Sequence, residues 1–221
     1  MIKRKVFIAL DTTNILKVKK IISHTQTNYI KIGYKFGLEF MNSKNGRNFI
    51  STLKNKTIFI DLKLHDTVNT MLSAVKALKD LNINYLTVHI SSGLAALKAV
   101  KKASKSNTKI VGVTTLTSLN NKDLKLIGYN KSVKSLVKFQ AKLAKKAGLD
   151  ALVCSPYEVN IVKKIFKKEI ITPGIQIGKK NYDQKRSMEA RNVKSDWLVI
   201  GRSITRGNIK KNIQKLIQDL K

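Results

Sequence analysis

The sequence predicts a (β/α)8 barrel, built as one domain that spans residues 1–221. Eight short apolar segments recur along the chain, and amphipathic helical patterns fill the gaps between them. Alternating strands and helices favour a parallel sheet with right-handed crossovers, and eight such units can close into a barrel. No linker, low-complexity block or change of composition divides the chain.

The predicted strands are short runs rich in apolar and β-branched residues, as expected for strands that are buried on both faces. In chain order they are Val6 to Leu10, Tyr29 to Gly33, Thr57 to Leu62, Tyr85 to Ile90, Lys109 to Thr114, Ala151 to Cys154, Ile170 to Thr172 and Trp197 to Ile200. Helices are predicted where apolar residues recur at helical spacing opposite lysines, for instance over Met71 to Leu81, Gly93 to Lys102, Val133 to Ala147 and Val159 to Phe166. The absence of an early glycine-rich phosphate loop argues against a dinucleotide-binding doubly wound sheet.

The chain is strongly basic, with 44 Lys and Arg against 13 Asp and Glu and a net charge of +31. Nearly all of the excess is lysine, and it is spread through every segment on the polar sides of the predicted helices. Aromatic residues make up only 6% and do not alternate with basic segments as a base-stacking platform would. We expect a solvated lysine-rich surface that attracts polyanions weakly, and no specific nucleic-acid partner.

Membrane association is not expected, because no apolar run approaches the length of a membrane span. The apolar stretch near the amino terminus ends at Asp11 after five residues, which predicts a first strand rather than a signal peptide. The single cysteine, Cys154, excludes an intrachain disulfide and is typical of a reducing compartment. A cytoplasmic location is therefore expected.

The run Asp61 to Asp66, DLKLHD, places charged residues at the end of an apolar strand. Strand alternation puts Asp61 and Lys63 on one face, and Asp66 follows in the turn, close enough to return toward Lys63. Desolvated charges are costly unless their partners are close. The motif by itself is compatible with a structural ion pair or with a catalytic group.

Other polar residues lie at or near the predicted ends of the strands, where barrel enzymes carry their active sites. They are Asp11, Lys31, His89, Thr114, Thr117, Gly201 and Arg202. Their convergence on one rim of the barrel favours the catalytic interpretation of DLKLHD.

Nine segments in order extend this pattern over essentially the whole domain: IALD (8–11), KIGYKFG (31–37), FIDLKLHDTVNT (59–70), LTVHISSG (86–93), VGVTTLTSL (111–119), GLDALVCS (148–155), ITPGIQ (171–176), YDQKR (182–186) and VIGRSIT (199–205). Together they resemble the orotidine 5′-phosphate decarboxylase family. That resemblance implies a (β/α)8 barrel that acts as a homodimer, with active sites shared between chains and with neither a metal nor an organic cofactor.

The resemblance implies decarboxylation of orotidine 5′-phosphate to UMP in pyrimidine biosynthesis. Lys63 would stabilise the carbanion-like C6 and then protonate it. Asp61 would face the departing carboxylate, and Asp66 would keep Lys63 charged and oriented. In the family, the residues that match Asp66 and Thr67 reach across the dimer interface.

The resemblance also implies binding roles by position. Lys31 would bridge the ribose and the Asp61 network, Asp11 would accept hydrogen bonds from ribose hydroxyls, and Thr70 would contact substrate from the partner chain. The remaining contacts would be Thr117 near the pyrimidine and Gln176, Gln184, Gly201 and Arg202 at the phosphate. Several positions keep plainer interpretations: a loop residue for Thr117, a surface amide for Gln184, an ordinary helix start for Gly201 and Arg202, and a helix cap for Asp11. His65 and His89 are interpreted as structural.

The chain departs from the family pattern at three positions. Thr67 and Val68 stand where many members have an apolar residue and a turn-stiffening proline. Gln176 stands where many bacterial members have arginine, although Lys179 and Lys180 follow in the same loop. We expect Thr67 and Val68 to affect turnover, and Gln176 to affect the affinity for the phosphate.

Two rival functions remain. Sugar-phosphate enzymes such as 3-keto-gulonate 6-phosphate decarboxylase and hexulose-phosphate synthase share the D-x-K-x-x-D core but need Mg²⁺. They use an acidic residue where KIGY places Lys31, and a protonated lysine cannot ligate a metal. The second rival is a non-enzymatic barrel that binds polyanions, against which the intact Asp61, Lys63 and Asp66 argue.

Overall fold

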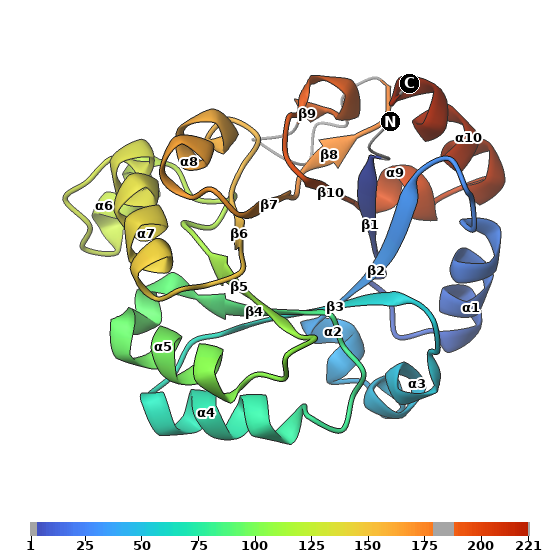
Figure 1. Cartoon of the computed structure of the whole chain (residues 1–221). Helices are drawn as coiled ribbons and strands as arrows, with labels where there is room; N and C mark the ends of the chain where they lie inside the picture. Colours follow the sequence, from blue (N-terminus) through green and yellow to red (C-terminus); the bar gives the residue numbers. More distant parts are fainter. Residues whose placement is uncertain (1–3, 179–187, 221) are drawn as a thin grey trace.

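A closed barrel of eight parallel strands is formed by the described residues, 4–178 and 188–220, of the computed structural model (Figure 1). The strands are β1 (Lys5–Ala9), β2 (Lys31–Gly37), β3 (Thr57–Leu64), β4 (Tyr85–His89), β5 (Lys109–Val113), β6 (Ala151–Val153), β7 (Glu169–Thr172) and β10 (Trp197–Ile200). They follow one another around the barrel in chain order, and β10 closes it by pairing with both β7 and β1. The predicted fold class is confirmed.

The helices surround this ring of strands and cover its outer face (Figure 1). They are α1 (Ile15–His24), α2 (Leu38–Met41), α3 (Gly46–Thr52), α4 (Val68–Ala77), α5 (Gly93–Ala103), α6 (Asn121–Leu126), α7 (Val133–Lys146), α8 (Val159–Ile165), α9 (Arg202–Thr205) and α10 (Ile209–Asp219), with 3-10 turns at Ile90–Ser92 and Ala190–Asn192. Each larger helix buries an apolar stripe against the strands. On α7 this stripe includes Val137, Ala141 and Ala144. Within the described ranges, no helix combines the length and apolar character needed to cross a bilayer.

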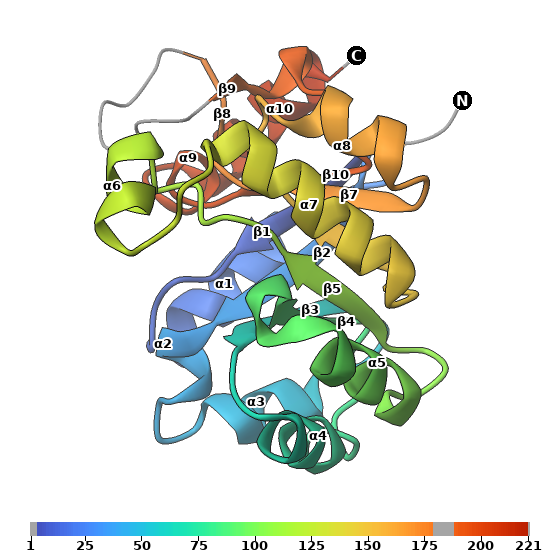
Figure 2. The ribbon, with the colours of Figure 1, turned by 90° about the vertical axis from the view of Figure 1, so that its left-hand side faces the viewer.

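Additional elements stand at the carboxyl end of the barrel. The short strands β8 (Ile175–Gln176) and β9 (Met188–Glu189) pair with each other beyond β7. Helix α6 follows β5 and projects past the end of that strand, as the side view in Figure 2 shows. A capping box at Asn120 and Asp123 fixes where α6 begins.

The barrel interior is filled by side chains from alternate strand positions. Phe7 stacks on Trp197 with ring centroids 4.0 Å apart and meets Phe59 at 4.9 Å. Gly33 makes room for Phe7, because a Cβ at this position would lie 2.5 Å from the Phe7 ring. This apolar layer separates the two ends of the barrel.

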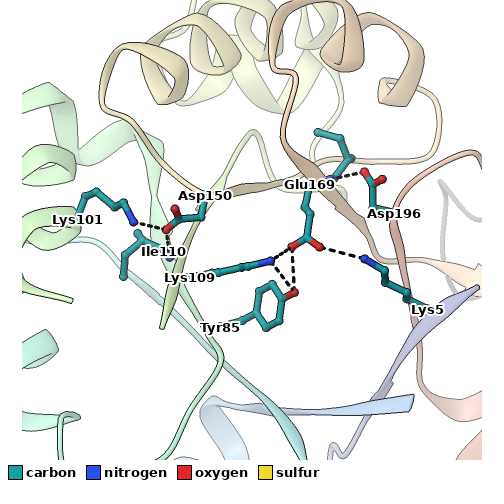
Figure 3. Close-up of polar contacts among 9 residues, drawn as sticks. Lys5, Tyr85, Lys101, Lys109, Ile110, Asp150, Glu169 and Asp196 are labelled. Atoms are coloured by element: carbon teal, nitrogen blue, oxygen red, sulfur yellow. Dashed lines mark hydrogen bonds and ion pairs between the residues drawn. The ribbon is translucent and has the colours of Figure 1, made fainter. Parts of the chain in front are cut away.

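A half-buried carboxylate, Glu169, pairs with lysines at the amino end of the barrel (Figure 3). Glu169 accepts hydrogen bonds from Lys5 Nζ at 3.2 Å, Lys109 Nζ at 2.7 Å and the Tyr85 hydroxyl at 2.9 Å. Burial raises the pKa of Glu169, but the hydrogen bonds from Lys109, Tyr85 and Lys5, together with the charge of Lys109, lower it below its ordinary value. These residues begin their strands, so this network lies at the end of a barrel that supports stability rather than catalysis.

Strand β2 differs from the prediction in a way that matters for the site. It begins at Lys31 and continues to Gly37, whereas the predicted strand ran from Tyr29 to Gly33. The continuation is paired on both sides, since Lys35 lies opposite Ala9 of β1 and Phe59 of β3. In the sequence, a lysine near the end of an apolar run usually indicates the start of a loop. The side chain of Lys35 instead points into the barrel.

Candidate active site

A cavity of about 280 Å³ opens at the carboxyl ends of the strands. Among the described residues its lining combines charged groups with apolar and backbone surface: Ala9, Asp11, Lys35, Phe59, Asp61, Lys63, Thr117, Val153, Pro173, Gly174, Ile175, Gln176, Val199, Gly201, Arg202 and Ser203. Its volume is near the lower end of the range for ligand pockets, about 300–1,000 Å³. It lies where (β/α)8 enzymes bind their substrates.

Asp61 lies at the centre of an alternating array of charges inside this cavity. Its Oδ2 is 2.9 Å from Lys63 Nζ and 3.4 Å from Lys35 Nζ. Lys35 also contacts the Oδ1 of Asp11 at 3.5 Å. The four groups therefore run Asp11, Lys35, Asp61, Lys63, with each cation next to a carboxylate.

The Asp61 carboxylate is held ionised despite its burial. Burial by itself raises its pKa, but the nearby charges of Lys35 and Lys63, with hydrogen bonds from Lys63 and Thr87, lower the pKa below its ordinary value. The residue is only 9% exposed. A fixed negative charge thus stands beside the Lys63 ammonium throughout the neutral pH range.

The backbone of Lys63 departs from the regular strand that the alternation argument assumed. The register between β3 and β4 shifts between Ile60 and Leu64, and Lys63 has a φ of 50°. Its N–H donates to Thr87 Oγ1 at 2.7 Å instead of to a strand carbonyl. The two side chains of Asp61 and Lys63 do meet, as predicted, but through this bulge.

Lys31 does not reach the array, so its predicted place in the Asp61 network is wrong. It lies opposite Lys5 at the amino end of β2, with its Nζ 5.9 Å from the centroid of the Trp197 ring. Lys35 is four residues further along the same inward face, which moves it roughly 13 Å toward the rim that holds the cavity. Lys35 therefore occupies the position that was assigned to Lys31.

Asp66, Thr67 and Thr70 are not part of the lining described for the cavity of their own chain. They form a cluster at the start of α4, where Asp66 Oδ1 accepts the Thr67 N–H at 2.7 Å and the Thr67 and Thr70 hydroxyls are 3.0 Å apart. The hydrogen bond from the Thr67 N–H is the main cause of the lowered pKa of Asp66. All three residues are exposed.

The remaining predicted contacts are distributed around the cavity. Thr117 lines it from the loop after β5, and Gln176 lies in β8 with only 8% exposure. Gly201 and Arg202 line it where β10 passes into α9. Gln184, Lys179 and Lys180 lie outside the described residues.

Two histidines lie beside the array. The rings of His65 and His89 stack with centroids 5.0 Å apart. Nδ1 of His89 is buried and has no hydrogen-bond partner among the described residues. Burial has the largest effect in lowering the pKa of His89, and the charges of His65 and Lys63 lower it further.

In the part of the chain that the structure describes, no three His, Cys, Asp or Glu side chains gather as a metal site.

Fold and site together define a (β/α)8-barrel protein with a lysine and carboxylate array at its mouth. The model of the orotidine 5′-phosphate decarboxylase / HUMPS family matches residues 4–215. The chain belongs to this family.

Individual relatives agree over nearly the whole length. The chain is 43% identical to an orotidine 5′-phosphate decarboxylase of Wolbachia sp. subsp. Brugia malayi over 217 residues, which cover 95% of each chain. It is 42% identical to that of Wolbachia pipientis subsp. Culex pipiens, with 89% of each chain covered. The crystal structure of the Lactobacillus acidophilus orotidine 5′-phosphate decarboxylase superposes with a TM-score of 0.83 at 29% identity, covering 99% of each chain.

Proposed function

We propose that this chain decarboxylates orotidine 5′-phosphate to UMP, with Lys63 as the cation and proton donor at C6. The observation that carries this proposal is the 2.9 Å contact between Lys63 Nζ and Asp61 Oδ2 inside the cavity. The family and its decarboxylase relatives support the same reaction.

The chemistry needs a positive charge that can also deliver a proton. The bond between C6 and the carboxylate carbon breaks, CO₂ leaves, and the electron pair remains at C6. The Lys63 ammonium stabilises that charge electrostatically and then transfers a proton from Nζ to C6, and solvent restores the proton afterwards. Asp61 faces the carboxylate before it departs and keeps Lys63 oriented.

Lys35 and Asp11 hold the sugar in this proposal. Lys35 lies within 3.5 Å of both Asp11 and Asp61, so it can bridge the ribose to the catalytic carboxylate. Asp11 is 62% exposed at its side chain and can accept hydrogen bonds from ribose hydroxyls. Lys35 takes the role that the sequence had suggested for Lys31.

The phosphate is assigned to the part of the cavity that Gly201 and Arg202 line, next to Asp11. The backbone at Gly201 and the Arg202 guanidinium supply donors suited to a dianion. A Cβ at Gly201 would make only ordinary contacts, at 3.5 Å from Ala9 and 3.8 Å from Asp11, so Gly201 lies next to the carboxylate that is assigned to the ribose. Gln176 offers a neutral amide from β8, while the proposed contact of Gln184 concerns a residue outside the described ranges.

A homodimer with shared active sites is part of the proposal. The start of α4 presents Asp66, Thr67 and Thr70 to solvent, together with Val68, an apolar residue that is 38% exposed. A second copy of the chain that covers this segment could place Asp66 beside the partner's Lys63.

Because the biosynthetic role and the single buried Cys154 suit a reducing compartment, we also propose that the protein acts in the cytoplasm.

The metal-dependent sugar-phosphate enzymes are the rival within the same fold. Their acidic metal ligand would have to stand where Lys35 stands, and an ammonium cannot ligate a cation. The test is the loss of orotidine 5′-phosphate absorbance after purified protein is added in the presence of EDTA. Full activity under chelation supports the proposal, whereas no loss of absorbance, together with Mg²⁺-dependent turnover of a sugar phosphate, would establish the rival.

A further inference from the structure

Thr87 lies at the centre of β4, fully buried, on the inward side of the barrel behind the charged array. It does not line the cavity described above, and although its segment, LTVHISSG, is part of the family resemblance, no role was predicted for Thr87 itself. Its hydroxyl nevertheless contacts the two residues on which the proposed chemistry depends. It accepts the N–H of Lys63 at 2.7 Å and donates to Oδ1 of Asp61 at 3.1 Å.

The contact to Lys63 supports an unusual backbone. With a φ of 50°, Lys63 is in the left-handed region, which is strained for a residue with a side chain. The shifted register between β3 and β4 would leave its N–H without a strand acceptor, and a buried unpaired N–H is costly. The Thr87 hydroxyl supplies that acceptor and so holds the bulge that directs Lys63 toward Asp61.

The contact to Asp61 fixes the rotation of its carboxylate. Oδ1 receives the Thr87 hydroxyl, while Oδ2 faces the ammonium groups of both Lys63 and Lys35. A hydroxyl has one proton to donate, and Thr87 donates it to the carboxylate because an ionised carboxylate can only accept, while the hydroxyl oxygen accepts the N–H of Lys63. One side chain therefore sets the backbone of one catalytic group and the side-chain orientation of the other.

We propose that Thr87 is a positioning residue that sets the distance and angle between Lys63 and Asp61 from behind the active site. This inference rests on the proposed roles of those two residues. Thr87 does not touch substrate, so its loss lowers the rate of the chemical step and leaves substrate binding largely intact. Thr87 also supports the ionised form of Asp61. Burial raises the pKa of the Asp61 carboxyl, and the charges of Lys35 and Lys63 lower it. The hydrogen bond from Thr87 is a smaller effect that lowers the pKa further.

The test compares Thr87→Val, which keeps the shape but loses the hydroxyl, with Thr87→Ser, which keeps the hydroxyl. Thr172→Val is the matched control, because Thr172 is equally buried and its Oγ1 has no hydrogen-bond partner among the described residues. We expect Thr87→Val to lower kcat about tenfold or more with KM changed less than about threefold, and Thr87→Ser to restore kcat to within about threefold of wild type. The acid limb of the kcat profile should move to higher pH in Thr87→Val alone.

Two results would overturn the proposal. One is a Thr87→Val enzyme with wild-type kcat and acid limb; the other is an equal loss of kcat in Thr87→Val and Thr172→Val. If the wild-type chain itself does not consume orotidine 5′-phosphate, the proposed function fails. That result concerns the wild type alone, so it can be distinguished from the two variant results that would overturn the role of Thr87.

Amide hydrogen exchange on the wild-type protein tests the contact without any variant and without substrate. The Lys63 amide should be protected to nearly the same degree as the amides within β4, although its own side chain is 36% exposed. Exchange as fast as that of the Val68 amide, in the exposed first turn of α4, would show that Thr87 does not hold this N–H, and would overturn the proposal even if Thr87→Val does not fold.

Discussion

The Lys35 ammonium lies 3.4 Å from the Oδ2 of Asp61, the same oxygen that Lys63 contacts at 2.9 Å. Two cations thus share one buried carboxylate oxygen, and this arrangement keeps Asp61 charged at the point where the substrate carboxylate would lie. Of the two inward-facing lysines of β2, Lys31 and Lys35, only Lys35 belongs to this array.

Lys35→Ala should lower kcat/KM by at least about 100-fold, since a charge-assisted contact to a buried carboxylate contributes roughly 1.5–3 kcal/mol and the substrate contact is lost as well. Lys31→Ala should change kcat/KM by less than about threefold, because Lys31 lies at the other end of the barrel. Steady-state assays of both variants decide the matter. Equal losses in the two variants would contradict the assignment of Lys35.

Mixing two inactive variants tests the shared site. Lys63→Ala and Asp66→Ala should each be nearly inactive if Asp66 acts in the partner's site. Random mixing makes half of the dimers mixed, and each mixed dimer regains one intact site of two, so about a quarter of wild-type activity should return. No recovery in heterodimers verified by mass spectrometry would place Asp66 and Lys63 in the same chain's site. An Asp66→Ala protein with wild-type activity would remove Asp66 from the mechanism.

The role of Arg202 can be separated from general damage by a truncated substrate. Arg202→Ala should cost about 1.5–3 kcal/mol in kcat/KM for orotidine 5′-phosphate, the value of a charge-assisted hydrogen bond. Its effect on orotidine, which lacks the phosphate, should be close to zero. The comparison is made by single-turnover assays, and equal losses on both substrates would argue against a phosphate contact.

His89 should make the protein more stable as pH rises toward neutrality. Burial and the nearby charges lower its pKa in the folded state, so the unfolded chain binds more protons between that folded pKa and about 6.5. The free energy of unfolding therefore increases with pH across this window and levels off above it. Urea unfolding from pH 5 to 7.5 measures the slope, which should flatten in His89→Gln and persist in the control His24→Gln. An unchanged slope in His89→Gln would assign the pH dependence to other groups.

The fold was predictable because buried parallel strands appear in the sequence as short apolar runs, as in Thr57-Ile-Phe-Ile60. The contact between Asp61 and Lys63 was predictable too, since a charge buried at the end of an apolar strand is costly unless an opposite charge lies close to it. The choice between Lys31 and Lys35 was not, because both point inward and only the register of β2 against β1 and β3 decides which one reaches the rim.

Thr87 could not have been found from the sequence either. A threonine in the middle of an apolar strand is typical of β structure and carries no signal of its own. Its significance depends on the shifted register between β3 and β4, which gives the Lys63 N–H a side-chain acceptor. Such a bulge depends on tertiary pairing and leaves no local pattern.

The decay of orotidine 5′-phosphate absorbance with wild-type and Lys63→Ala protein, in buffer freed of metals, tests the central claim most directly. We expect steady turnover by the wild type and a loss of at least about 1,000-fold in Lys63→Ala, since both charge stabilisation and proton donation disappear. Far-ultraviolet circular dichroism should show the same fold in both proteins. Turnover by Lys63→Ala within about tenfold of wild type would contradict the role of Lys63 as the catalytic cation.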